Sequence, residues 1–106
     1  SREVAKDESV DIGDNLSENV GKNVTVSIGE NQSLSVGKDS KSQIGKKYYL
    51  EAGDEVILKT GDASITMKKD GTITIKGKDI TVQGSGKIGI KASSDVVIKG
   101  SKIAEN

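Results

Sequence analysis

The sequence predicts an all-β fold: an intertwined triple-stranded β-helix, a triangular prism, formed by a homotrimer with octad repeats. Three observations predict it. Glycine returns at every eighth position from residue 13 to residue 61, and hydrophobic residues, 32% of the 106, alternate with polar ones beside those glycines. The chain also has no proline, which cannot donate a hydrogen bond to a sheet. Since an alternation of period two is typical of strands and repeated glycine weakens helices, we expect almost no helix.

The repeat unit of residues 1–61 is a short strand followed by a glycine and a polar link. Its corner glycines are Gly13, Gly21, Gly29, Gly37, Gly45, Gly53 and Gly61. Asn or Asp stands two residues after four of them, at Asn15, Asn23, Asn31 and Asp39. Because glycine reaches positive φ without steric cost, and Asn and Asp tolerate it, we expect each octad to turn a corner there.

The apolar residues beside these glycines are the predicted trimer core. In residues 1–61 they are Val10, Ile12, Val20, Val26, Ile28, Leu34, Val36, Ile44, Leu50 and Leu58. Near residue 62 the register changes, because glycine now follows the second apolar residue of a pair by two positions. The later core residues are Ile65, Met67, Ile73, Ile75, Ile80, Val82, Ile88, Ile90, Val96 and Ile98, and the later corner glycines are Gly77, Gly84 and Gly100.

The absence of a linker at this register change predicts one domain. We expect a single β-helical shaft over 1–106, with Val-Gly-x-Asn octads in 1–61 and Val-x-Gly octads in 62–106. The pattern leaves the strand boundaries open near 62–72 and 84–87.

Two apolar residues per octad are too few for one strand to enclose a core, which predicts association. Single-chain β-solenoids have coils of about 20 residues or more, so three octads of one chain are one way to close a triangular coil. Three chains wound around one axis do the same when each contributes one octad to each face in turn. Neighbouring strands then come from different chains, and about 13 octads at ~4.8 Å per strand give a prism roughly 60 Å long.

The composition excludes several function classes. Without His and Cys, the Ser-His-Asp and Cys-His catalytic systems and the usual zinc sites are impossible. The balance of 16 basic and 16 acidic residues argues against a nucleic-acid partner. We find no apolar run of the ~20 residues that a membrane span needs, and expect no signal peptide. We therefore predict no enzyme, no catalytic residue, no cofactor and no metal site.

Two motifs are interpreted as corners rather than ligand sites. Residues 84–89 match G-x-G-x-x-G, but a β-rich stretch follows them where a dinucleotide site needs a helix. Gly-Asp pairs at 13–14, 53–54 and 61–62 lack the Gly-Gly-x-Gly-x-Asp context of a calcium-binding β-roll. Solvated corners explain both motifs.

Several segments carry a resemblance to a known family: Val20-Gly21-Lys22-Asn23, Ile28-Gly29-Glu30-Asn31, Val36-Gly37-Lys38-Asp39 and the later Val82-Gln83-Gly84. They resemble the C-terminal β-helical shaft of VgrG, the spike protein of type VI secretion, which is related to the baseplate needle of contractile phages. The resemblance covers essentially the whole chain. It implies an intertwined homotrimer at the tip of a contractile injection machine, which punctures membranes rather than binding them and delivers effectors.

The same resemblance implies partners and a location. A PAAR-type tip protein caps the C-terminal end of such shafts, and we expect Ile103 and Ala104 to form that cap-binding end because the last strands of a trimer lack partners. We expect the secretion tube and the effectors to act through parts of the spike outside these residues. The resemblance implies assembly in the bacterial cytoplasm and secretion through the type VI apparatus. The alternatives are a phage baseplate needle and a fragment of a trimeric tailspike or adhesive stalk.

Overall fold

The structure is a computed structural model that describes residues 3–105, and its regular secondary structure is entirely β. The chain divides into two units, one up to Gln43 and one from Ile44 onward. The change of repeat register near residue 62 lies inside the second unit. Neither unit contains a helix in its described part, so the all-β prediction is confirmed. No described helix is long and apolar enough to cross a membrane.

In the first unit the backbone bends at regular intervals. The bends fall at residues 5–6, 13–14, 21–22, 29–30 and 37–38. Four of them lie at a corner glycine and the residue after it, and the first lies at Ala5, which occupies the glycine place of an earlier octad. No strand is paired between residues 3 and 43.

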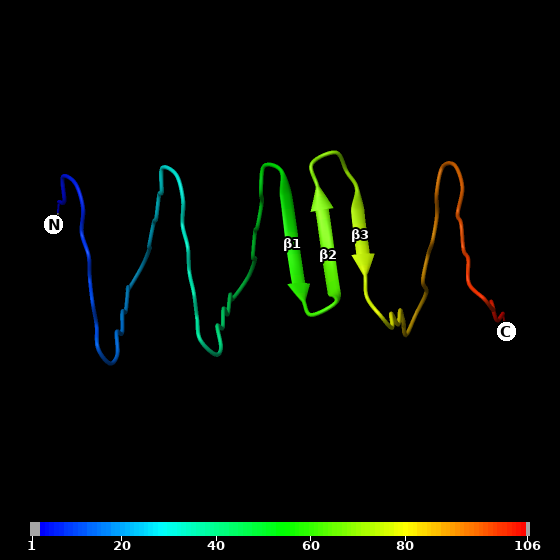
Figure 1. Ribbon diagram of the computed structural model, residues 1–106, viewed down its shortest axis with the longest axis horizontal. Coiled ribbons are helices and arrows are strands. Elements are labelled where there is room, and N and C mark those ends of the chain that lie inside the picture. The colour runs from blue at the N-terminus through cyan, green and yellow to red at the C-terminus, as the bar shows by residue number, and fades with distance from the viewer. Residues whose placement is uncertain (1–2, 106) are drawn as a thin grey trace. The chain divides into compact units, whose positions relative to one another are not determined.

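The second unit contains a three-stranded antiparallel meander (Figure 1). Its strands are β1 (Glu55–Thr60), β2 (Ala63–Lys68) and β3 (Ile73–Lys76), with β2 in the middle. The backbone bends before the meander at 45–46 and 53–54, and after it at 78–79, 85–86 and 93–94. The alternation of Val, Ile and Thr with other residues explains why these segments form strands.

The turn between β1 and β2 is a two-residue hairpin loop, Gly61-Asp62. Gly61 has a φ of 53°, whereas no described residue other than glycine has a positive φ. A positive φ at the first loop residue alone is the geometry of a type II′ turn, whose twist matches that of the paired strands. Glycine at this position therefore fixes the register in which Thr60 faces Ala63.

The loop between β2 and β3 contains a type I turn followed by a residue in the left-handed region. The Gly71 N–H donates to the carbonyl of Lys68, and the Lys68 N–H donates to the carbonyl of Thr72, both at 3.0 Å. Gly71 has a φ of 95°, as expected where such a turn ends in a bulge. The Thr72 N–H donates to the Asp70 carboxylate at 2.9 Å, which lowers the pKa of that exposed carboxyl.

Two expectations from the sequence are wrong here. Positive φ is not the reason for most corner glycines, because among the described residues only Gly61 and Gly71 have it. The expectation that neighbouring strands come from different chains also fails for 55–76, where three consecutive segments of one chain pair with each other. The two turns bring this about, since each reverses the chain at the end of a strand.

The chain encloses no core within its described part. None of those residues is buried, and only Val56, Ser64, Thr66 and Gly77 are even half-buried. The apolar side chains that normally form the interior of a domain are thus available to other chains.

Candidate functional site

The candidate site is the apolar face of the meander. The register places Val56, Met67 and Ile73 in one row across the three strands. A second row is formed by Leu58, Ile65 and Ile75. Because side chains of a strand alternate between faces, all six lie on the same face of the sheet. Five of them are exposed by 41–63%.

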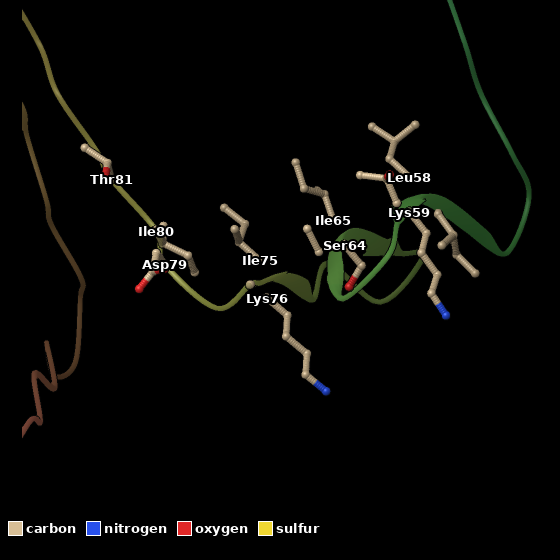
Figure 2. A pocket seen from close by; sticks show the side chains of 13 residues that line it. Leu58, Lys59, Ser64, Ile65, Ile75, Lys76, Asp79, Ile80 and Thr81 are labelled. Carbon is tan, nitrogen blue, oxygen red and sulfur yellow. The ribbon is translucent and has the colours of Figure 1, made fainter. Parts of the chain in front are cut away.

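The opposite face of the meander is mostly polar, with Ile57, which faces Thr66 and is 58% exposed, as its apolar member. It carries Lys59 and Ser64 in register, followed by Lys76 on β3. In Figure 2 the side chains of Leu58, Ile65 and Ile75 project to one side of the ribbon, and those of Lys59 and Lys76 project to the other. The sheet therefore has one face suited to water and one suited to burial.

An open groove runs along the edge of the apolar face. Its apolar lining comes from Leu58, Ile65 and Ile75, and Ile80 extends it beyond β3 (Figure 2). This groove is wide and lies on the surface of the sheet, so it does not form an enclosed substrate pocket.

The other predicted core residues are also exposed. Their exposed fractions run from 45% at Ile44 to 80% at Leu34. This holds for Val10, Ile12, Val20, Val26, Ile28, Leu34, Val36, Ile44, Leu50, Ile80, Val82, Ile88, Ile90, Val96 and Ile98. The single chain leaves open which of these residues meet in an assembly, so their role as a trimer core stays a prediction.

The corner glycines fall into two groups by the space around them. A Cβ added at any of the first seven would have no heavy atom within 4 Å in the chain. At Gly84, by contrast, a Cβ would lie 3.0 Å from Cγ1 of Ile88, and at Gly77 it would lie 3.4 Å from Cγ1 of Ile80. Within one chain, close packing explains glycine only in the second group.

Polar contacts join the segment before β1 to the residue after β2. The Lys69 N–H donates to the Asp54 carbonyl at 3.0 Å, and the Lys69 ammonium lies 3.3 Å from the Asp54 carboxylate. Both side chains are exposed, so this ion pair adds little stability. Nearby, the Tyr49 hydroxyl donates to the Glu51 carboxylate at 2.6 Å, and this hydrogen bond raises the pKa of Tyr49.

Residues 3–105 contain no group of three or more Asp, Glu, His or Cys residues able to hold a metal ion. At the C-terminal end Ile103 is 62% exposed and Ala104 is exposed as well. Nothing in the single chain tests the cap-binding role predicted for these two residues.

The sequence reasoning missed the meander as a unit. It assigned Leu58, Ile65 and Ile75 to the core but did not place them in one row. The available signals were Gly61-Asp62 and Asp70-Gly71, because such dipeptides between alternating apolar segments are strong indications of hairpins.

Comparison with known families supplies the context of this exposed apolar surface. The family of the bacteriophage T4 gp5 C-terminal trimerisation domain matches residues 1–60. No curated protein matches the chain. The matched family is a structural spike domain and not a known family of enzymes. Since the match covers more than half of the 106 residues, the chain belongs to the family of the bacteriophage T4 gp5 C-terminal trimerisation domain, the β-helical spike shaft of the VgrG and gp5 type.

Proposed function

We propose that the chain is the shaft of a spike, built as a homotrimeric triple-stranded β-helix with octad repeats. One observation carries the proposal. Between residues 10 and 53 the backbone bends every eight residues and makes no backbone-to-backbone hydrogen bond within the chain. Folded proteins pair nearly all buried backbone N–H and C=O groups. Two further copies of the same segment supply those partners when each octad pairs with octads of its neighbours.

The apolar side chains support the same assembly. Leu34 is 80% exposed and Val26 is 70% exposed in the single chain, and Leu50 is 63% exposed. Burial of a Val, Leu or Ile side chain contributes about 1.5–3 kcal/mol. Two such residues per octad, directed at a three-fold axis, give each layer of the shaft its own core. The charged residues, 30% of the chain, then remain outside in water.

The function that follows is mechanical. In such a shaft the hydrogen bonds between chains run along the length of the rod, because strands stack in that direction. A load along the axis then compresses many hydrogen bonds and apolar contacts together. A rod of this kind transmits the thrust of a contracting sheath and punctures a membrane without binding to it.

The machine that we propose is the type VI secretion system, with the chain as part of a VgrG spike. The spike assembles in the bacterial cytoplasm and leaves through the apparatus, delivering effectors attached to other parts of the spike. A PAAR-type tip protein caps the end at Ile103 and Ala104. The resemblance of the Val-Gly and Val-x-Gly units to VgrG shafts supports this assignment.

The second candidate is the baseplate needle of a contractile phage. It is favoured by the matched family, which is described by a phage protein. A trimeric tailspike or adhesive stalk is a further alternative. Two tyrosines as the sole aromatic residues make a glycan-cleaving tailspike a poor fit, because sugar platforms are usually aromatic.

The first experiment is the native mass of the purified chain by light scattering. A mass of about 33 kDa, three times the 11.1 kDa of one chain, supports the shaft. A mass of 11.1 kDa with a β-type circular dichroism spectrum would mean that the chain folds alone, and the proposal would be wrong.

A second experiment tests the tip and the type of machine. Binding of a purified PAAR-type protein to the trimer is measured with the full chain and with a variant lacking residues 99–106. We expect the truncated chain to remain a trimer and to lose the tip protein. Undiminished binding would contradict the role of Ile103 and Ala104.

A further inference from the structure

The meander differs from the rest of the chain in pairing its strands internally. Residues 55–76 form three antiparallel strands of one chain, whereas residues 10–53 contain no paired strand. The apolar face of a sheet contributes to stability when it is removed from water. Within the described chain it is not, since Ile65 and Met67 are 41% and 46% exposed, and Ile73 and Ile75 are each 63% exposed.

The face is continuous with the trimerisation domain. The family match ends at residue 60, the last residue of β1. Leu58 therefore lies within the matched domain, and it faces Ile65 on β2, which in turn faces Ile75 on β3. Because the three side chains share one face of one sheet, a Leu58 directed at a three-fold axis directs Ile65 and Ile75 at the same axis.

We propose that residues 55–76 form a three-fold collar in which each chain keeps its own three-stranded sheet and presents its apolar face to two further copies of the chain. This inference rests on the proposed trimeric shaft and adds a second mode of assembly to it. In the shaft the chains exchange strands, and in the collar they lie side by side. Two layers of apolar side chains, one from each row, fill the centre of the collar.

The polar face fits this arrangement. It carries Lys59, Ser64 and Lys76, which would lie on the outer side of each sheet, in water, together with a single apolar residue, Ile57. The two turns, at Gly61-Asp62 and at Gly71, close the sheet without any residue from another chain. The two ladders of the meander are thus formed within one chain before association, and association adds burial of its apolar face.

Cysteine cross-linking of the full chain tests the collar, because the natural sequence contains no Cys. Ile65→Cys and Met67→Cys place thiols on the apolar face, and Thr66→Cys places one on the polar face of the same strand. Leu34→Cys is the control for the shaft. After oxidation, or reaction with a short bis-maleimide, non-reducing gels report which cysteines join two chains.

The collar predicts dimer bands from the variants at 65 and 67, and no dimer band from Thr66→Cys. Two of the three chains become joined while the third stays single. A trimer that cross-links at Leu34→Cys but at neither 65 nor 67 would overturn the collar and leave the shaft intact. A monomeric native mass would overturn the shaft first, and the collar with it.

A double variant tests whether each sheet belongs to one chain. Thr66 and Thr74 face each other on β2 and β3. Opposite residues of an antiparallel pair have Cα atoms about 4.5–5.5 Å apart, which is within the range that a disulfide spans. Thr66→Cys/Thr74→Cys should form a disulfide within one chain and run as a monomer without reductant. A ladder of dimers and trimers would show that the strands are exchanged and would contradict the proposal.

Discussion

Replacement of Ile65 by Asp should separate the chains of the trimer. Ile65 lies at the centre of its row, on the middle strand of the meander. The matched control is Thr66→Asp, which adds the same charge to the next residue of the same strand but on the polar face. Both variants therefore share the cost in strand propensity, and only the face differs.

The magnitude follows from the exposed fraction of Ile65. This side chain is 41% exposed in the single chain. Since full burial of an Ile contributes about 1.5–3 kcal/mol, covering the exposed part contributes about 0.6–1.2 kcal/mol per chain, or roughly 2–4 kcal/mol per trimer. At 1.4 kcal/mol for each factor of ten, its loss alone weakens association roughly 30- to 1,000-fold. Repulsion among three carboxylates at one axis adds to this loss.

The assay is native mass by light scattering over a dilution series in moderate guanidinium. Ile65→Asp should dissociate at higher protein concentration than the natural chain, and Thr66→Asp should follow the natural chain closely. Equal weakening by both variants would show that the two faces of β2 are equivalent in the assembly. That result would refute the argument from the register.

Three further predictions concern the turns and corners. Gly71→Ala should destabilise the β2–β3 hairpin by about 1–2 kcal/mol, because Gly71 has a φ of 95° that Ala adopts only with strain; the loss is measured by denaturant unfolding. The pKa of Asp70 is lowered by the N–H of Thr72, so its contribution to stability is present above the ordinary Asp pKa and is lost as pH falls through the lowered value; an NMR titration should show this carboxyl titrating below the ordinary Asp pKa. Gly29→Ala should leave a single chain unstrained, because Gly29 has no positive φ and no atom near an added Cβ. If chains meet at this corner, the added Cβ should weaken the trimer by roughly 1–3 kcal/mol per crowded corner and lower the guanidinium midpoint of unfolding. An unchanged midpoint would show that the corner stays open in the assembly.

The sequence predicts the β class and the family well because both depend on repetition. Glycines at a period of eight and apolar residues beside them are visible without any tertiary information. Bends at 13–14, 21–22 and 29–30 fall at those glycines. The all-β class and the family resemblance were accordingly confirmed, the first by the strands and the second by the match over residues 1–60, while the triple-stranded β-helix stays a prediction.

The meander was harder to predict because its first turn coincides with the octad repeat. Gly61 continues the series of corner glycines, yet it is the first residue of a hairpin loop. The pattern of a corner and the pattern of a two-residue turn are the same at this position. Only the second turn, at Asp70-Gly71, breaks the rhythm and marks the hairpins.

The sequence alone also does not decide why glycine is needed at the corners. A recurring glycine indicates either a positive φ or a close approach of other atoms. Most corner glycines lack a positive φ, and in the first seven octads nothing in the chain would touch an added Cβ. Ala5, at a bend in the same phase, shows that a residue with a Cβ fits this backbone. The remaining physical reason is a neighbouring chain, and that reason lies outside any one chain.

The exposed apolar residues and the unpaired backbone therefore have one common explanation. A chain with 32% hydrophobic residues and no described buried residue would be expected to remain unfolded on its own, because it cannot offset the entropy of ordering. Residues 10–53 lack both a core and backbone partners, so association must provide both at once. The meander pairs its three strands within one chain but still lacks the cover of its apolar face. In the shaft folding and association are therefore a single step, whereas at 55–76 the strand pairing lies within one chain and its stability depends on association.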